Sequence, residues 1–129
     1  MGWTEADIRA VVGPQRCRVL MGLNPTPALP ADTPEDAFLH KVRQLARREG
    51  WLCYHTHRSE RSEPGFPDLV LTKPGRLIFA ELKSATGKLT PFQHTWLDLL
   101  RHSVAHVEVY CWRPADYAEI VAILTRRTP

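Results

Sequence analysis

The stretch "GFPDLVLTKPGRLIFAELKSATGK", residues 65–88, contains two short apolar runs separated by a turn sequence. Each run is marked by charge that a buried strand would not tolerate: Asp68 begins the first run, and "ELK" ends the second. Between them, Pro74 and Gly75 fit the two central positions of a type II turn. These residues therefore predict a β-hairpin whose open end is charged.

The turn also predicts which residues of the hairpin face each other. If Lys73 to Arg76 is a tight turn, residues 73 and 76 pair, and Asp68 lies opposite Glu81. A β-bulge would slip the pairing by one residue, but the two carboxylates would remain neighbours. Side chains alternate along a strand, so Glu81 and Lys83 share a face. Two acids and one amine are thus expected at the open end of the hairpin.

The predicted carboxylate pair suggests a metal site. Opposed like charges destabilise a sheet, and a partly buried pair tends to hold a proton unless a cation neutralises it. Oxygen ligands without clustered Cys or His favour Mg²⁺ or Mn²⁺ over Zn²⁺. Lys83 would then orient or deprotonate a water, or stabilise charge that develops on phosphorus. A salt bridge from Lys83 to Asp68 or Glu81 is the alternative that this spacing leaves open.

A helix is expected between Thr33 and Gly50. Thr33 can cap it, Pro34 suits its first position, and Gly50 offers a C-terminal stop. Its apolar residues recur at helical spacing and are Phe38, Leu39, Val42, Leu45 and Ala46. "WLCYH", residues 51–55, then alternates as a strand does.

A second helix pattern begins at Thr90, where T-x-x-Q predicts a capping box with Gln93. Its expected buried stripe comprises Phe92, Trp96, Leu99 and Leu100. "HVEVYCW", residues 106–112, is typical of a further strand, and Pro114 opens a last helix. The order of helix, three strands, helix, strand and helix predicts an α/β fold, a mixed sheet flanked by helices.

The 129 residues suit one domain. We expect that domain at residues 33–129, after an N-terminal arm or linker at residues 1–32, because "NPTPALPADTP" is too rich in proline for regular structure. No apolar run approaches the roughly 18 residues needed to cross a bilayer, and a signal-peptide pattern is missing. A cytoplasmic protein with no membrane partner is therefore expected. The three cysteines lack CxxC spacing and are interpreted as reduced thiols.

The formal net charge of +3 and the pI near 9.0 are mild, but basic residues are concentrated between two apolar blocks. They are Lys41, Arg43, Arg47, Arg48, Arg58 and Arg61. This local charge permits a polyanionic partner. A solvated helix face is the alternative explanation of the same charges.

"PD" at residues 67–68 followed by "ELK" at residues 81–83 resembles the signature of PD-(D/E)XK nucleases. The wider set of "GW", "GFPDL", "ELK", "GKLTPFQ" and "WRP" resembles the VRR-NUC subgroup of that superfamily, over residues 33–124. The resemblance implies a single restriction-endonuclease-like domain that hydrolyses phosphodiester bonds with Mg²⁺ or Mn²⁺. Small members are similar to Holliday-junction resolvases of phage and bacterial type, which act as homodimers on branched DNA. Larger relatives carry the module as a structure-selective DNA repair nuclease.

The resemblance assigns roles by position in this sequence. Asp68 and Glu81 match the metal-binding acids, the backbone carbonyl of Leu82 matches a further ligand, and Lys83 matches the catalytic lysine. Glu35 matches an acid that family members place near the metal, although an acid in a first helical turn also complements the helix dipole.

Other positions match the family less specifically. Gln93 matches a glutamine near the active site, and its capping-box position supplies a structural reason as well. Lys88 would contact a phosphate or remain a solvated loop lysine. The predicted DNA-contacting residues are Arg58, Arg61, Ser62, Lys88, Lys41 and Arg47. The same resemblance favours a bacterial or phage-infected cell as the setting.

Three alternatives stay open from the sequence. The same chemistry would serve a flap or duplex nuclease, and the same fold would serve a DNA-binding module that does not cleave. Cys53, His55 and His57 alternate onto one strand face and are the candidates for a zinc site.

Overall fold

The computed structural model describes residues 27–57, 62–103 and 106–126. In chain order the elements are α3 (Glu35–Arg48), β1 (Leu52–His55), β2 (Leu69–Lys73), β3 (Arg76–Leu82), α4 (Pro91–Ser103), β4 (Val107–Trp112), the short 3-10 helix η1 (Pro114–Asp116) and α5 (Tyr117–Thr125). This is the element order that the sequence predicts.

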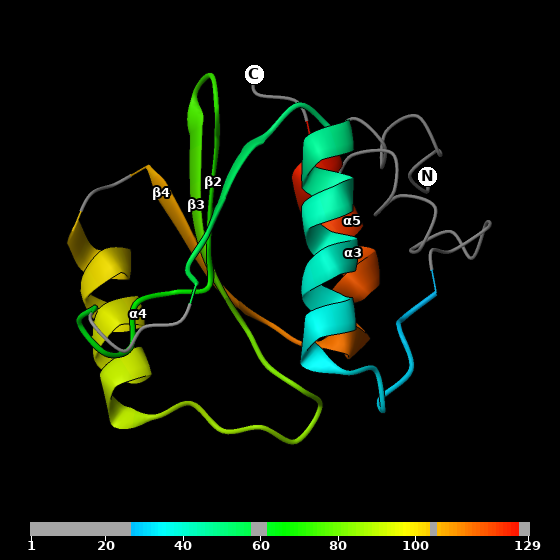
Figure 1. The fold of residues 1–129 in the computed structure, drawn as a ribbon. Helices are drawn as coiled ribbons and strands as arrows, with labels where there is room; N and C mark the ends of the chain where they lie inside the picture. Colours follow the sequence, from blue (N-terminus) through cyan, green and yellow to red (C-terminus); the bar gives the residue numbers. More distant parts are fainter. Residues whose placement is uncertain (1–26, 58–61, 104–105, 127–129) are drawn as a thin grey trace, which may run out of the picture.

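The four strands form one mixed sheet in the order β1-β2-β3-β4. The first three pair antiparallel, and β4 joins β3 in parallel. Helices α3 and α5 lie on one face of the sheet and α4 lies on the other (Figure 1). The predicted α/β fold with a mixed sheet flanked by helices is therefore confirmed. Among the described residues, no helix combines the length and apolarity that a membrane span needs.

The register of the β2–β3 hairpin is the one that the tight turn predicts. Lys73 pairs with Arg76, and four pairs further along, Leu69 pairs with Ala80. Gly75 has a φ of 79°, which the third position of a type II turn requires. The next position in this register places Asp68 opposite Glu81.

The main core lies between the sheet and the pair α3 and α5. Alternate residues of β2 and β3 face it, and all of them are buried: Leu69, Leu71, Ile78, Ala80 and Leu82. From the helices, Phe38, Val42, Ile120 and Leu124 are fully buried against them. Helix α5 is buried along most of its length, which explains its nearly continuous apolar sequence.

The start of α3 differs from the prediction. The helix begins at Glu35, and the N-cap residue is Pro34, which makes no side-chain capping hydrogen bond. The Thr33 hydroxyl instead donates a hydrogen bond to the carbonyl of Pro30 at 2.6 Å. The prediction that Thr33 caps the helix is therefore wrong, because Pro34 occupies the N-cap position and Thr33 lies one residue before it. The predicted stop is confirmed, since Gly50 follows the helix with a φ of 87°.

Helix α4 confirms its predicted cap but not its predicted buried stripe. The Thr90 N–H donates to the Gln93 side chain at 2.9 Å, and the Gln93 N–H donates to the Thr90 hydroxyl at 3.2 Å. Leu97 is the buried residue of the helix, whereas Phe92 and Leu99 are 60% and 66% exposed. The helix packs against β4 through a narrow face, and sequence periodicity does not reveal which face the sheet will cover.

The last part of the predicted arm contacts the domain. Leu29 packs against the main core, and its N–H donates to the carbonyl of Pro114 at 3.0 Å. Residues 1–26 lie outside the described residues, so the division at residue 32 stays a prediction.

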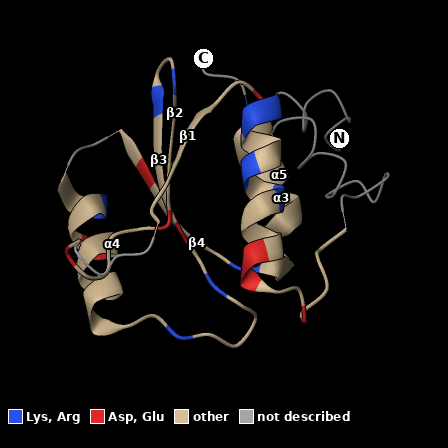
Figure 2. Ribbon diagram, in the orientation of Figure 1, with Lys and Arg blue, Asp and Glu red and all other residues tan. Residues whose placement is uncertain are grey.

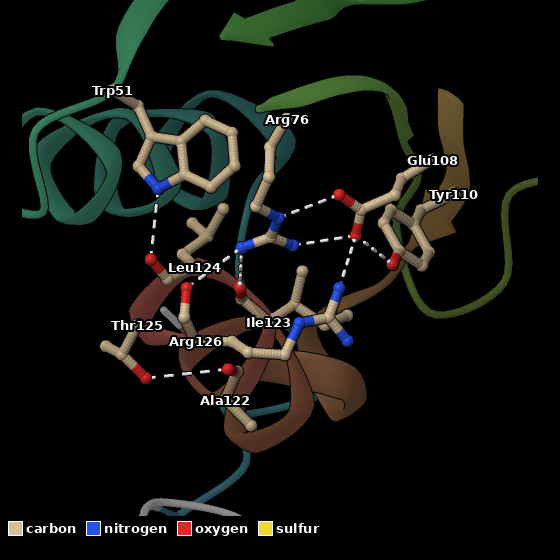
Figure 3. Close-up of polar contacts among 9 residues, drawn as sticks. All are labelled: Trp51, Arg76, Glu108, Tyr110, Ala122, Ile123, Leu124, Thr125 and Arg126. Carbon is tan, nitrogen blue, oxygen red and sulfur yellow. Dashed lines mark hydrogen bonds and ion pairs between the residues drawn. The ribbon is translucent and has the colours of Figure 1, made fainter. Parts of the chain in front are cut away.

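Arg76, in the hairpin turn, joins the sheet to the end of α5 (Figure 3). Its guanidinium donates two hydrogen bonds to the Glu108 carboxylate, at 2.9 and 2.7 Å. It also donates to the carbonyls of Ile123 and Arg126, at 2.8 and 3.2 Å. These are carbonyls at a helix C-terminus, which have no partner within the helix. One buried side chain therefore holds three elements together.

Trp51 completes this anchor. Its indole N–H donates to the carbonyl of Leu124 at 3.0 Å, and the Arg76 guanidinium lies 4.8 Å from the centre of its ring. Burial raises the pKa of Glu108, but hydrogen bonds from Arg76 and Tyr110 outweigh it, and the net pKa lies below its usual value. Glu108 is therefore an ionised partner of Arg76 at neutral pH.

We expect Arg76→Met to lower the free energy of unfolding by about 3 kcal/mol, because it leaves the Glu108 carboxylate and two carbonyls without their main donor. Arg126 also pairs with Glu108, at 2.9 Å, but its side chain is 52% exposed. Arg126→Met is the matched control and should cost less than about 1 kcal/mol. Urea unfolding of both variants at pH 7 measures the difference, and equal losses would contradict the role given to Arg76.

Candidate active site

Asp68 lies immediately before β2 and is held from both neighbouring strands. Its carboxylate accepts a hydrogen bond from the backbone N–H of Leu82 at 2.8 Å. Its own carbonyl accepts from the N–H of Thr56 at 2.9 Å. The β2–β3 ladder ends at this point, so the side chain takes the place of a backbone acceptor. The Asp68 carboxylate is thereby fixed at the open end of the hairpin.

Glu81, near the end of β3, is only 3% exposed. One carboxylate oxygen accepts a hydrogen bond from the Gln93 side chain at 3.0 Å. The other, Oε2, is buried and has no hydrogen-bond partner among the described residues. Burial, and then the adjacent carboxylate of Asp68, raise the pKa of Glu81 to about 8, while the charge of Lys83 opposes the shift. Without a cation, this carboxyl group holds a proton at neutral pH.

The carboxylate pair fits a hard divalent cation. A buried oxygen without a partner beside a second carboxylate is the donor arrangement that Mg²⁺ or Mn²⁺ would relieve. In the described parts of the chain, no three Asp, Glu, His or Cys side chains are grouped to hold a metal. Asp68 and Glu81 would therefore need a backbone carbonyl, such as that of Leu82, together with water and substrate oxygens. Mg²⁺ sites characteristically keep such open positions.

The zinc alternative is not formed as a three-ligand group within the described residues. The rings of His55 and His57 lie near each other, with centroids 5.0 Å apart. Cys53 does not complete a metal-binding group with them, so this arrangement gives no support to a zinc site.

Lys83 directly follows β3, and its backbone is fixed. Its N–H donates to the carbonyl of Trp112 at 2.9 Å, which extends the parallel ladder by one residue. Within the described ranges, no ion pair joins Lys83 to Asp68 or Glu81, so the strand-end salt bridge that the spacing left open is not formed. The ammonium group nevertheless acts on the site, because its charge lowers the pKa of Glu81 against the effect of burial.

Two side chains hold the loop that follows Lys83. The Glu35 carboxylate accepts a hydrogen bond from the N–H of Ser84 at 3.2 Å. The Arg113 guanidinium donates to the carbonyls of Ser84 and Gly87, at 2.6 and 2.7 Å. Sequence reasoning missed Arg113, because only the fold brings it to this loop. Glu35 is an exposed acid near the site whose observed partner is the loop backbone.

Two clefts meet at Asp68. The larger, of about 410 Å³, is lined by His55, Thr56, His57, Glu63, Gly65, Phe66, Asp68, Glu81 and Gln93. The smaller, of about 310 Å³, is lined by Glu35, Asp36, Leu39, His55, Asp68 and Leu82. His55 and Asp68 line both. The predicted acids and Gln93 therefore line two clefts that share a wall at the open end of the hairpin.

The wall of the larger cleft depends on a glycine. Gly65 has a φ of 92°, and a Cβ at this position would lie 2.5 Å from the backbone carbon of Phe92. Any other residue would push the loop away from the start of α4. Phe66 next to it packs edge-on against Phe79 and Trp96, at 6.1 and 5.1 Å between ring centres. The "GF" of "GFPDL" thus has a structural role in shaping the cleft.

The predicted DNA-contacting residues that the structure describes do not line the clefts, whereas the predicted acids do. Ser62, Lys88, Lys41 and Arg47 are exposed, and none of them lines either cleft. Arg58 and Arg61 lie outside the described residues. Arg47 belongs to the basic last turn of α3, while the first turn of the same helix is acidic (Figure 2). Glu63 lines the larger cleft without having been predicted, and His55, which the sequence suggested only as a zinc ligand, lines both clefts.

Comparisons with known proteins agree with this geometry. A family model described as "VRR-NUC domain" matches residues 23–111. A solved structure, itself described as a VRR-NUC domain, is similar with a TM-score of 0.54 and 22% sequence identity, over 73% of this chain and 97% of that chain. At that identity the likeness shows the fold. No curated protein is detectably similar in sequence.

The raised pKa of Glu81 predicts how stability depends on pH when no metal is added. The folded state retains a proton that the unfolded chain, with an ordinary pKa near 4.5, releases. Stability should therefore fall as pH rises from about 4.5 to about 8. Glu81→Gln cannot ionise, so it should unfold several degrees above the unmodified protein at pH 8.5, and the difference should shrink toward pH 5.

Thermal unfolding in EDTA across this pH range checks the prediction. Asp32→Asn, which changes an exposed carboxylate outside the helices and strands, is the control for a simple change in net charge. A Glu81→Gln variant that is less stable than the unmodified protein at every pH would contradict the buried, uncompensated charge.

Proposed function

The chain belongs to the VRR-NUC domain family, which implies a nuclease of the PD-(D/E)XK type, and we propose that it is a metal-dependent endonuclease acting on branched DNA such as four-way junctions. The observation that carries the proposal is the Asp68–Glu81 pair, in which one buried carboxylate oxygen has no partner in the described parts of the chain. A fold of this size has no structural need for two opposed acids at a strand end. A site that takes up a cation explains them.

We assign the roles residue by residue. Asp68, Glu81 and the Leu82 carbonyl would hold Mg²⁺ or Mn²⁺, and Glu35 would support the site from α3. Bound there, the cation would neutralise charge on the phosphate and make water more acidic. Gln93 fixes the orientation of the Glu81 carboxylate through its 3.0 Å hydrogen bond, while the capping box fixes Gln93 itself.

Lys83 is the proposed catalytic amine. Its backbone is fixed by Trp112, whereas its side chain is not engaged by either acid. The ammonium group would position a water molecule for in-line attack on phosphorus and stabilise the negative charge that develops there. The water oxygen bonds to phosphorus, the bond to the 3′ oxygen breaks, and a proton ends on that oxygen. The products would carry 5′-phosphate and 3′-hydroxyl ends.

DNA contacts are proposed for exposed residues around the site. Lys88 precedes the N-terminal turn of α4, and such a turn favours phosphate. Ser62, Lys41 and Arg47, with Arg58 and Arg61, would add contacts to the sugar-phosphate backbone. Because these contacts carry much of the affinity, binding and catalysis should be separable by mutation.

We expect Lys83→Ala, Asp68→Asn and Glu81→Gln each to lower the cleavage rate by about 100-fold or more while DNA affinity stays largely intact. Labelled four-way junction, flap and linear duplex, each with Mg²⁺, Mn²⁺ or EDTA, provide the assay. Lys73→Met changes a lysine at the opposite end of the hairpin and is the matched control. Unchanged turnover with lost binding in the Asp68 or Glu81 variant would contradict the assignment.

The same assay decides between the competing functions. Symmetric nicks in the junction would support a resolvase, and preferential cutting of flap or duplex would keep the chemistry and change the substrate. DNA binding without cleavage in any metal would favour a non-cleaving module.

We further propose that the active form is a homodimer. One chain offers one such site, and two symmetric incisions need two sites related by a two-fold axis. Sedimentation equilibrium should therefore give twice the mass of the chain without DNA, and twice that mass plus the mass of the junction when the junction is bound. A monomer that makes paired incisions in a single encounter would contradict this proposal.

A further inference from the structure

The described residues contain three buried side-chain atoms without a hydrogen-bond partner: Glu81 Oε2, Arg43 Nε and His55 Nδ1. Buried polar atoms are nearly always paired, so each exception needs an explanation. A cation explains the Glu81 oxygen. It does not explain Arg43, because a guanidinium only donates hydrogen bonds and carries positive charge.

Helix geometry places Arg43 beside the smaller cleft, although Arg43 is not itself among the residues that line it. Glu35, Leu39 and Arg43 are spaced by four residues along α3 and so form one stripe of the helix. The first two line the smaller cleft together with His55 and Asp68. Arg43 continues this stripe one turn further along α3, which packs against β1, the strand that ends at His55.

The charges around Arg43 leave it open to an anion. It makes no hydrogen bond or ion pair with any residue that the structure describes. It lies near enough to His55 that, after burial, its charge is the main cause of the lowered pKa of that imidazole. In either protonation state the imidazole carries at least one N–H donor, which can join the guanidinium in binding an oxygen atom.

We propose that Arg43 and His55 form a phosphate-binding site beside the Asp68–Glu81 pair, and that it holds a backbone phosphate of the DNA substrate. A guanidinium binds two phosphate oxygens with parallel hydrogen bonds, which a lysine does not reproduce. Both clefts share His55 and Asp68, so a strand that enters one cleft can continue into the other. This site rests on the proposed function for its ligand but uses neither the acids nor Lys83.

The test measures DNA binding in EDTA, so that cleavage and metal play no part. Fluorescence anisotropy of a labelled four-way junction over a range of salt concentrations gives the affinity and its salt dependence. Arg43→Met should weaken binding roughly tenfold and reduce the slope of log K against log salt by about 1. His55→Gln should weaken binding less and leave the slope unchanged. Arg48→Met, an exposed arginine of the same helix, is the matched control and should change neither.

Arg43→Lys separates charge from geometry. It should keep the salt slope of the unmodified protein while losing part of the affinity, because the charge remains and the paired hydrogen bonds do not. Unmodified affinity and slope in Arg43→Met would overturn the site even if the protein cleaves DNA.

A protein that binds no DNA would defeat the proposed function, and the site can then be tested by itself with inorganic phosphate. ¹H–¹⁵N NMR of the histidine rings should show His55 resonances that shift on adding phosphate, and these shifts should be lost in Arg43→Met. Absence of a phosphate-dependent shift in the unmodified protein would overturn the inference.

Discussion

The register of the β2–β3 hairpin is the constraint on which the rest of the structure depends. Pairing Lys73 with Arg76 fixes both ends of the hairpin at once. At the open end it places Asp68 against Glu81, and at the turn it directs Arg76 to Glu108 and the end of α5. A slip of one residue would turn Glu81 into the apolar core and the core residues of β3 toward α4. The apolar side chains facing α3 and α5 oppose this slip and so hold together two acids that repel each other.

The same hairpin buries two ionisable side chains, Arg76 and Glu81, and only one of them has its hydrogen-bonding groups satisfied. Arg76 is almost fully buried, and five hydrogen-bonded or stacked contacts satisfy it (Figure 3). Glu81 is equally buried, yet one of its oxygens has no partner among the residues that the structure describes. The contacts of Arg76 show that this fold can satisfy a buried ionisable side chain, whereas the unpaired oxygen of Glu81 lowers stability. Such local conflicts between stability and structure are expected at functional sites.

Features set by short stretches of sequence were predictable, and features set by packing were not. The proline-glycine turn and the T-x-x-Q capping box of α4 depend on neighbouring residues, and both are confirmed. The cap of α3 was not, because the helix begins one residue later than predicted and the Thr33 hydroxyl donates to the carbonyl of Pro30. The buried face of α4 depends on where the helix rests on the sheet, so Leu97 is buried in place of Phe92 and Leu99.

The residues of the candidate site also separate into those that a local sequence pattern reveals and those that only the packing of the fold brings together. Asp68, Glu81, Lys83 and Gln93 could be proposed because they are close in sequence and carry a known pattern. Arg113 and Glu35 hold the loop after Lys83 from elements 29 and 49 residues away from Ser84, and no local signal announces such contacts. Their combined effect is specific: the backbone on both sides of Lys83 is fixed, while neither acid binds its ammonium group. An amine held in this way is positioned by the fold and still available to a water molecule or a phosphate.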